Sequence, residues 1–302
     1  MIDVLTAGGG ELLGLGAYLP GTMLALLAAV LFGLGSVLQH EAAEKAAPDG
    51  RLSMRTMVRQ RGWLVGQGVT VTGSGAQVAA LTLAPVSIVQ PLLVGALVAA
   101  LVARTVRRGR RPARGELSGA ALTVGGLVVF VVAARPTQAA VVAPPAAWAT
   151  LAAVSAVTLA VALTARLGAG SGAALACGVA GGLAAGVSAV LVSSAAGVVE
   201  TDGPAGALAG PGLWGAAVTA IVSQVGAQQA YGRGSLSWSL PALVVADPLT
   251  AVPAARFLLG EHLEPGHALV WGPAGMVAVF GVVLLSRSSV QPPPRTAAAA
   301  GT

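Results

Sequence analysis

The chain has 302 residues, of which 55% are hydrophobic and only 9% are charged. Its mean hydropathy is +0.82, and soluble domains carry about 25% charged residues, so the composition excludes an ordinary soluble domain and predicts an integral membrane protein. A net charge of +6 in such a chain is typical of basic loops that set membrane topology. We therefore expect a lipid bilayer, and no nucleic acid, as partner.

Runs of about 20 apolar residues, the length that crosses a bilayer as a helix, predict an all-α membrane protein with nine transmembrane helices. In chain order, the expected spans are 19–40, 62–83, 86–104, 117–134, 146–166, 172–199, 211–231, 239–259 and 267–286. Residues 1–18 form an N-terminal segment, and residues 287–302 form a polar, Pro-rich tail that is expected to be disordered.

The basic residues predict the orientation of these helices. Only Arg135 and Arg256, of the 17 Lys and Arg residues, fall on one side of the membrane. The others fall on the opposite side: Lys45, Arg51, Arg55, Arg59, Arg61, Arg104, Arg107, Arg108, Arg110, Arg111, Arg114, Arg166, Arg233, Arg287 and Arg295. Because cytoplasmic loops are enriched in Lys and Arg, the N-terminus is expected outside the cell and the C-terminus in the cytoplasm. The expected location is the plasma membrane, as a multi-pass protein.

Two halves of the chain resemble each other. Trp63 precedes a Gly-Ala-Gln triplet that ends at Gln77, and Trp214 precedes the triplet that ends at Gln228 by the same spacing. The alternative is chance similarity between helices rich in Ala, Gly and Val. Paired helices are five apart, an odd number, so a true repeat has copies of opposite orientation, as in several secondary transporters.

The repeat also pairs the third helix with the eighth, so that Gln90 and Pro91 fall opposite Asp247 and Pro248. The predicted organisation is 4+1+4. A first transmembrane repeat (19–134) is followed by a connector helix (135–171) and a second repeat (172–286).

Asp247 is the only acid deep inside an apolar segment. An acid at the centre of a membrane helix costs about 2.5–3.5 kcal/mol on insertion scales, and a residue kept at that cost suggests function. The prolines that follow the paired positions, Pro91 and Pro248, lack a backbone donor and are expected to break their helices. Asp247 is therefore predicted to bind a cation, including a metal ion, or a proton. The alternatives are a charge pair with Arg256 or a permanently protonated acid.

Intramembrane glutamines are the remaining candidates for a binding site: Gln77, Gln90, Gln224 and Gln228, with Gln39, Gln67 and Gln229 nearby in sequence. A pseudo-twofold axis is expected to bring Gln77, Gln90, Gln228 and Asp247 toward one central cavity. Amides both donate and accept hydrogen bonds, which suits a polar solute or a cation. Their alternative role is to bond helices to one another.

The stretch Leu81–Leu92 (LTLAPVSIVQPL) and the sequence Leu258-Leu259-Gly260-Glu261 resemble the EamA-like drug/metabolite transporter (DMT) superfamily. The nine-helix arrangement, with a basic loop after the first helix, is similar to its NIPA-like branch. The resemblance implies a secondary transporter, and the branch implies magnesium transport. One departure from the pattern is that Arg104-Thr105-Val106-Arg107 stands in the first half where the second half has its acid.

Other polar residues are predicted at the membrane surfaces. His40, Glu41 and Glu44 are expected either to gather cations or to form a solvated turn. Acidic and histidine side chains are expected to make the outer face negative: Glu200, Asp202, Glu261, His262 and Glu264. Gly178, Gly182 and Gly186 form a close-packing face that either seals the repeat interface or makes a homodimer.

No nucleotide-binding loop, zinc motif or nucleophile triad stands in the sequence. We therefore expect no cofactor and no enzyme activity. The expected function is secondary transport of Mg²⁺ or another divalent cation. The alternatives are a transporter of a small polar metabolite and a non-transporting membrane scaffold or partner subunit.

Overall fold

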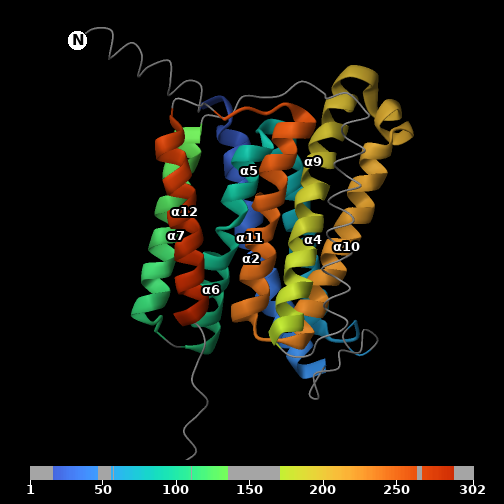
Figure 1. Cartoon of the computed structure of the whole chain (residues 1–302). Helices are drawn as coiled ribbons and strands as arrows, with labels where there is room; N and C mark the ends of the chain where they lie inside the picture. The colour runs from blue at the N-terminus through green and yellow to red at the C-terminus, as the bar shows by residue number, and fades with distance from the viewer. Residues whose placement is uncertain are drawn as a thin grey trace, which may run out of the picture.

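A computed structural model of the chain describes residues 16–46, 56, 58–109, 111–134, 171–263 and 267–288. Throughout these ranges the regular secondary structure is helical, and the helices stand side by side in one bundle (Figure 1). The long ones are α2 (Leu19–Ala46), α4 (Arg61–Leu83), α7 (Arg114–Ala134), α9 (Ser171–Ala209), α10 (Pro211–Arg233) and α12 (Ala268–Ser288). Two more spans are divided: α5 (Val86–Leu93) with α6 (Ala96–Arg108), and α11 (Leu236–Ala254) with a turn of π-helix, η1 (Ala255–Leu259).

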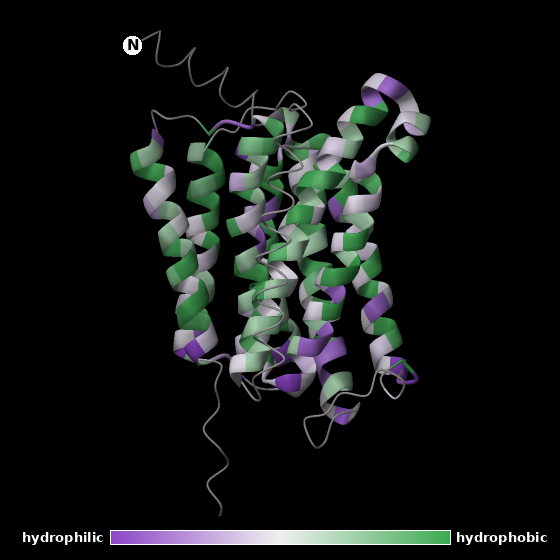
Figure 2. Cartoon of the chain, turned by 45° about the vertical axis from the view of Figure 1, so that its right-hand side comes forward, coloured by the Kyte–Doolittle hydropathy of each residue, from purple (hydrophilic) through white to green (hydrophobic). Residues whose placement is uncertain are grey.

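Six of the spans are long and apolar enough to cross a membrane: Leu19–Ala43, Val86–Arg107, Arg114–Ala134, Gly172–Ala209, Leu236–Leu259 and Ala268–Ser288. The chain is thus a multi-pass membrane protein. The less apolar helices α4 and α10 have 23 residues each, which gives a length of about 34 Å, and they stand beside the other helices (Figure 1). Figure 2 shows apolar residues along the height of the bundle and polar residues gathered toward its lower end.

The described helices lie where the sequence places eight of the nine expected spans. The fifth expected span, 146–166, and the tail after Ser288 lie outside the described residues, as does most of the N-terminal segment. The helices are several residues longer than their apolar runs. α2 continues to Ala46, and α9 continues to Ala209 across a kink at Gly203, whose φ of 73° is left-handed.

The expectation that Pro248 breaks its helix is wrong. α11 stays helical from Leu236 to Ala254 with Pro248 inside it, and the regular α-helix ends only beyond Pro253, where η1 begins. A proline removes one backbone donor, and packing against a neighbouring helix can hold the remaining turns in place. Pro91 is likewise inside α5, and the break follows it at Val94–Gly95.

The neighbour that holds α11 in place is α9. A Cβ added at Gly178 would lie 2.7 Å from the carbonyl oxygen of Ser239, and one added at Gly186 would lie 2.6 Å from that of Asp247. Only glycine permits this approach of two backbones. The face that contains Gly182 is therefore filled by α11 within the same chain and is not free to form a homodimer.

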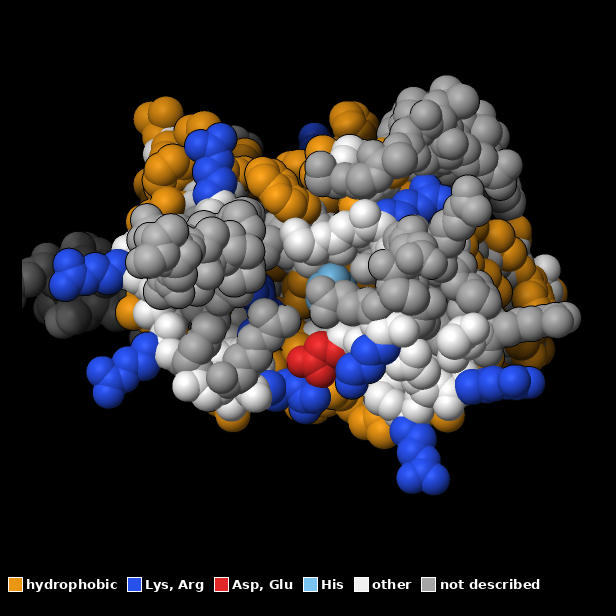
Figure 3. Space-filling model, turned by 90° about the horizontal axis from the view of Figure 1, so that it is seen from below, with side chains coloured by type: hydrophobic (Ala, Val, Ile, Leu, Met, Phe, Trp, Pro, Cys, Tyr) orange, Lys and Arg blue, Asp and Glu red, His pale blue; other side chains and the backbone are white. Residues whose placement is uncertain are grey.

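The basic residues gather at one end of the bundle. The lower ends of α2, α4, α6, α7, α10 and α12 in Figure 1 carry Lys45, Arg61, Arg107, Arg114, Arg233 and Arg287. Figure 3 shows Lys and Arg side chains around this face, seen from below. The described part of the chain therefore separates its positive charge as the sequence predicts, with Arg256 of η1 at the opposite end.

Candidate functional site: a buried acid beside a cavity between the helices

A cavity of about 370 Å³ lies between α2, α4, α9, α10 and α11 with the α5–α6 segment, and it is partly open, since Ser74 and Val78 of its wall are exposed. Its wall is mostly apolar, and its polar members are Ser36, Gln39, Thr70, Ser74, Gln77, Ser188, Ser223, Gln224, Tyr231 and Asp247. Among the described residues that line the cavity, Asp247 alone carries a charged side chain. The volume is in the usual range for small-molecule sites, which is about 300–1,000 Å³.

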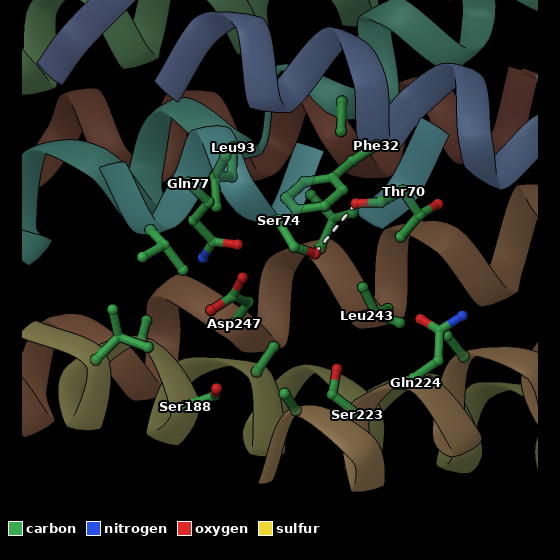
Figure 4. Close-up of a pocket in the computed structure, with 18 of the residues that line it drawn as sticks. Phe32, Thr70, Ser74, Gln77, Leu93, Ser188, Ser223, Gln224, Leu243 and Asp247 are labelled. Carbon is green, nitrogen blue, oxygen red and sulfur yellow. Dashed lines mark hydrogen bonds between the residues drawn. The ribbon is translucent and has the colours of Figure 1, made fainter. Parts of the chain in front are cut away.

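Asp247 lies midway along the 24-residue span Leu236–Leu259 and is 7% exposed. Its carboxylate contacts Gln90 of α5, which is fully buried. In the amide orientation that satisfies both ends, Gln90 Nε2 donates to Asp247 Oδ1 at 2.8 Å and to Oδ2 at 3.1 Å. Gln90 Oε1 then accepts from Gln77 Nε2 at 3.1 Å. Figure 4 shows Gln77 and Asp247 at the same end of the cavity, with their polar groups turned toward each other.

The structure thus brings together three of the predicted site residues, Asp247, Gln90 and Gln77. Gln228 does not join them. It is 2% exposed and bonds to Gln39 and Trp63. The reason is geometric: Gln77 lies six residues before the upper end of α4, whereas Gln228 lies five residues before the lower end of α10. The pseudo-twofold axis of an inverted repeat lies in the plane of the membrane and exchanges its two sides. Two matched residues that lie far from the midplane therefore end up near opposite sides of the membrane.

Gln228 belongs to a second polar cluster, at the basic end of the cavity. Its amide oxygen accepts from Trp63 Nε1 at 3.1 Å, and its amide nitrogen donates to Gln39. Gln39 Nε2 in turn donates to Thr70 Oγ1 at 2.6 Å and to the carbonyl of Gly66 at 3.1 Å. These bonds tie α10 to α2 and α4 at the basic end of the cavity.

Gln224 stands between the two clusters. It lines the cavity, and its Nε2 donates to Gln67 Oε1 at 2.6 Å, which joins α10 to α4. Tyr231 of α10 makes a further hydrogen bond between helices, donating from its hydroxyl to Ser36 Oγ of α2 at 2.9 Å. Sequence reasoning missed Tyr231 and Trp63 as parts of the site. An aromatic residue one to three turns from an intramembrane glutamine was the available signal.

Gly186 lets the backbone at Asp247 approach α9, because it has no side chain to meet the Asp247 carbonyl. The Asp247 side chain lies at the cavity wall. Arg256 is not its ion-pair partner, since the Arg256 guanidinium instead contacts His262 Nε2 at 2.8 Å. The charge pair that the sequence left open is therefore not formed.

Glu261 is not part of an acidic outer surface, as the sequence led us to expect. It is 4% exposed, and its carboxylate accepts from the backbone nitrogens of Val86 at 2.8 Å and Ser87 at 2.9 Å, as well as from the Ser87 hydroxyl. An acid here satisfies the free N–H groups at the start of α5 and complements the helix dipole. Glu200 and Asp202 are exposed as expected, but on the continuation of α9.

The residues after the first expected span do not form a solvated turn, because α2 continues through them. His40 is 5% exposed and packs edge-on against Tyr231, with ring centroids 6.2 Å apart. Glu41 accepts two hydrogen bonds from Arg107, at 2.7 and 3.2 Å. Among the described residues there is no group of three or more His, Cys, Asp or Glu that could hold a metal ion.

The chain is similar to an uncharacterized protein of Corynebacterium glutamicum, with 26% identity over 276 residues that cover 89% of this chain and 96% of the relative. No family model and no solved structure matches the chain. The similarity extends along nearly the whole of both chains and names no activity, so the function has to be argued from the site.

Proposed function

We propose that this protein is a secondary transporter of the drug/metabolite type that binds its substrate in the cavity beside Asp247. The observation that carries the proposal is the buried carboxylate of Asp247, midway along its span and at the wall of a cavity of about 370 Å³. Ionisable residues inside membrane spans are costly and mark substrate or ion pathways. The binding group consists of Asp247, Gln90 and Gln77, with Gln224 on the same cavity wall.

The proposed architecture has nine membrane helices in a 4+1+4 inverted repeat, with the basic end in the cytoplasm of the cell. Three features of the packing support it. α2 packs on α4 as α9 packs on α10, a divided span follows each pair (α5–α6 and α11–η1), and α7 packs against α12. Substrate sites in inverted-repeat transporters lie near the midplane between the halves, which is the depth of Asp247.

The first substrate class we propose is a divalent cation such as Mg²⁺, in line with the NIPA-like resemblance. Mg²⁺ usually keeps several waters and is bound through one or two carboxylates. At about 30 Å³ per water, a cation with six waters needs roughly 200 Å³, which the cavity provides. The second class is a small polar metabolite, and the neutral amides and hydroxyls of the wall favour it. The single carboxylate of Asp247 suits both substrate classes. It serves as a ligand for the divalent cation, or as the proton carrier when the substrate is a polar metabolite.

The test is transport by the purified full-length chain in lipid vesicles. Mg²⁺ entry is followed with a dye enclosed in the vesicles, and polar metabolites are tested by exchange of labelled compounds. Asp247→Asn keeps the shape of the side chain and removes its charge, and we expect it to abolish cation-dependent transport. Glu200→Gln, which neutralises an exposed acid on α9, is the matched control and should transport normally. Unchanged rate and ion dependence in Asp247→Asn would refute the site.

The rival proposal, a non-transporting scaffold, predicts no polar pathway. Cysteines placed at Ser74 and Ser223, which line the cavity from α4 and α10, in a Cys177→Ser background distinguish the two. A transporter exposes them to polar thiol reagents in at least one conformation, and adding substrate changes the labelling rate. A scaffold leaves both unlabelled from either side.

A further inference from the structure

Gln90 and Gln77 do more than fill space beside Asp247. Gln90 is fully buried and does not line the cavity, whereas Gln77 is half-buried and does. We propose that the two amides form a reversible hydrogen-bond relay that transmits the protonation state of Asp247 to the cavity wall. This inference rests on the proposed transport function and specifies how a proton is exchanged for a cation there.

The first link of the relay is the Gln90 amide. When Asp247 is ionised, Gln90 Nε2 donates to both carboxylate oxygens, at 2.8 and 3.1 Å. When Asp247 carries a proton, that proton needs an acceptor, and Gln90 Oε1 takes this position if the amide turns by half a rotation. The oxygen and nitrogen of an amide are nearly the same size, and a spacing of 2.8 Å fits both N–H···O and O–H···O bonds. Both states of the acid are therefore satisfied without any shift of the surrounding helices.

The second link is Gln77. Opposite an ionised Asp247, Gln77 Nε2 donates to Gln90 Oε1 at 3.1 Å. After Gln90 turns, its Nε2 faces Gln77 and requires an acceptor, so Gln77 turns too and presents Oε1. The end of Gln77 that faces the cavity thereby changes from an acceptor oxygen to a donor nitrogen.

The turn of the Gln77 amide makes the site bind a cation less well when Asp247 is protonated. With Asp247 ionised, the wall offers a negative charge and an acceptor oxygen, and both attract a cation or a donor-rich solute. With Asp247 protonated, the wall is neutral and offers an N–H donor, which repels a cation. Proton and cation thus compete for one carboxylate, and the relay extends the competition to a second group. This is the condition for exchange rather than joint transport.

Other titratable groups on the packed helices have partners elsewhere. Tyr231 of α10 bonds to Ser36 and contacts the His40 ring of α2, and Cys177 of α9 lies 3.5 Å from Arg233. Glu261 bonds to the start of α5. The other charged or titratable residues described on these elements, or next to them in the case of His267, lie toward helix ends: Glu41, Lys45, Arg61, Arg104, Arg107, Arg108, Glu200, Asp202, Arg256, His267 and Arg287. The orientation of the two amides therefore depends on the protonation state of Asp247.

The relay is tested by infrared difference spectroscopy on the full-length protein in lipid vesicles, with glutamine carrying ¹³C in its side-chain carbonyl. A step in pH should change the carboxylic acid band of Asp247 and, together with it, the labelled amide bands. Asp247→Asn should lose both changes. Gln90→Leu, which keeps the volume but cannot hydrogen-bond, should keep the carboxyl change and lose the amide change.

Gln229→Leu is the matched control, because Gln229 is an intramembrane glutamine of α10 that does not line the cavity. It should leave both signals as in the wild type. Should Gln90→Leu fail to fold, Gln77→Leu removes the half-buried second link and should reduce the amide change. A carboxyl change without an amide change in the wild type overturns the relay alone. An amide change that persists in Gln90→Leu also overturns it. A silent carboxyl band overturns proton binding as well, while vesicle transport of Mg²⁺ separately decides the proposed function.

Discussion

Replacing Glu261 with alanine should cost more stability than replacing any exposed acid of this chain. The substitution leaves the Val86 and Ser87 nitrogens and the Ser87 hydroxyl without their acceptor, at a position that is 4% exposed. Loss of a helix cap costs about 0.5–2 kcal/mol, and each hydrogen bond to a charged group contributes about 1.5–3 kcal/mol. Since these terms overlap, we expect a loss of about 3–5 kcal/mol in the free energy of unfolding.

The assay is thermal unfolding of the purified protein in one fixed detergent, followed by tryptophan fluorescence. A loss of this size lowers Tm by roughly 6 °C or more, at about 2 °C per kcal/mol for a chain of this length. Glu261→Gln keeps one acceptor oxygen and should fall between Glu261→Ala and the wild type. Glu200→Gln changes an exposed acid and should shift Tm by no more than about 1–2 °C. If Glu261→Ala melted together with Glu200→Gln, the cap on α5 would not be a stabilising contact.

Three further variants probe the packing around the cavity. Gly186→Ala places a Cβ 2.6 Å from the carbonyl oxygen of Asp247 and so forces α9 and α11 apart. We expect a higher substrate KM in vesicle transport together with a lower Tm. Gln228→Leu leaves the Trp63 indole N–H without its acceptor and should lower stability by about 1–3 kcal/mol in the same unfolding assay. Glu41→Gln weakens a partly exposed ion pair and should change stability by less than about 1 kcal/mol, most visibly at low salt.

The helices could be predicted from the sequence because the bilayer restricts the backbone conformations that can cross it. Backbone groups in hydrocarbon must be bonded within their own helix or barrel, so apolar runs mark the spans whatever their neighbours are. The same reasoning fails at Pro248, where local chemistry predicts a break and the helix continues. The reason lies at Gly186 on α9, whose lack of a side chain lets the two backbones pack, and no local pattern in α11 contains that information.

The contacts around Asp247 could be predicted in part for a related reason. Asp247 is conspicuous in any hydropathy pattern, and the repeat correctly pointed to Gln90 as its neighbour. The repeat misplaced Gln228 because sequence matching gives which positions correspond but not their depth in the membrane. Glu261 could not be predicted as buried, since its contacts reach across 174 and 175 residues of chain.

The two acids of the second half act on the same short helix. Glu261 holds the backbone at the start of α5, and Asp247 holds the Gln90 side chain one turn further on. All eight residues of α5 are buried, and the helix is interrupted just after them at Val94–Gly95. The backbone stays in the helical region through this interruption, at Val94 and Gly95, so α5 and α6 belong to one membrane span, Val86–Arg107. A charge change at Asp247 therefore acts first on the Gln90 side chain, while Glu261 holds the backbone at the start of α5 in place.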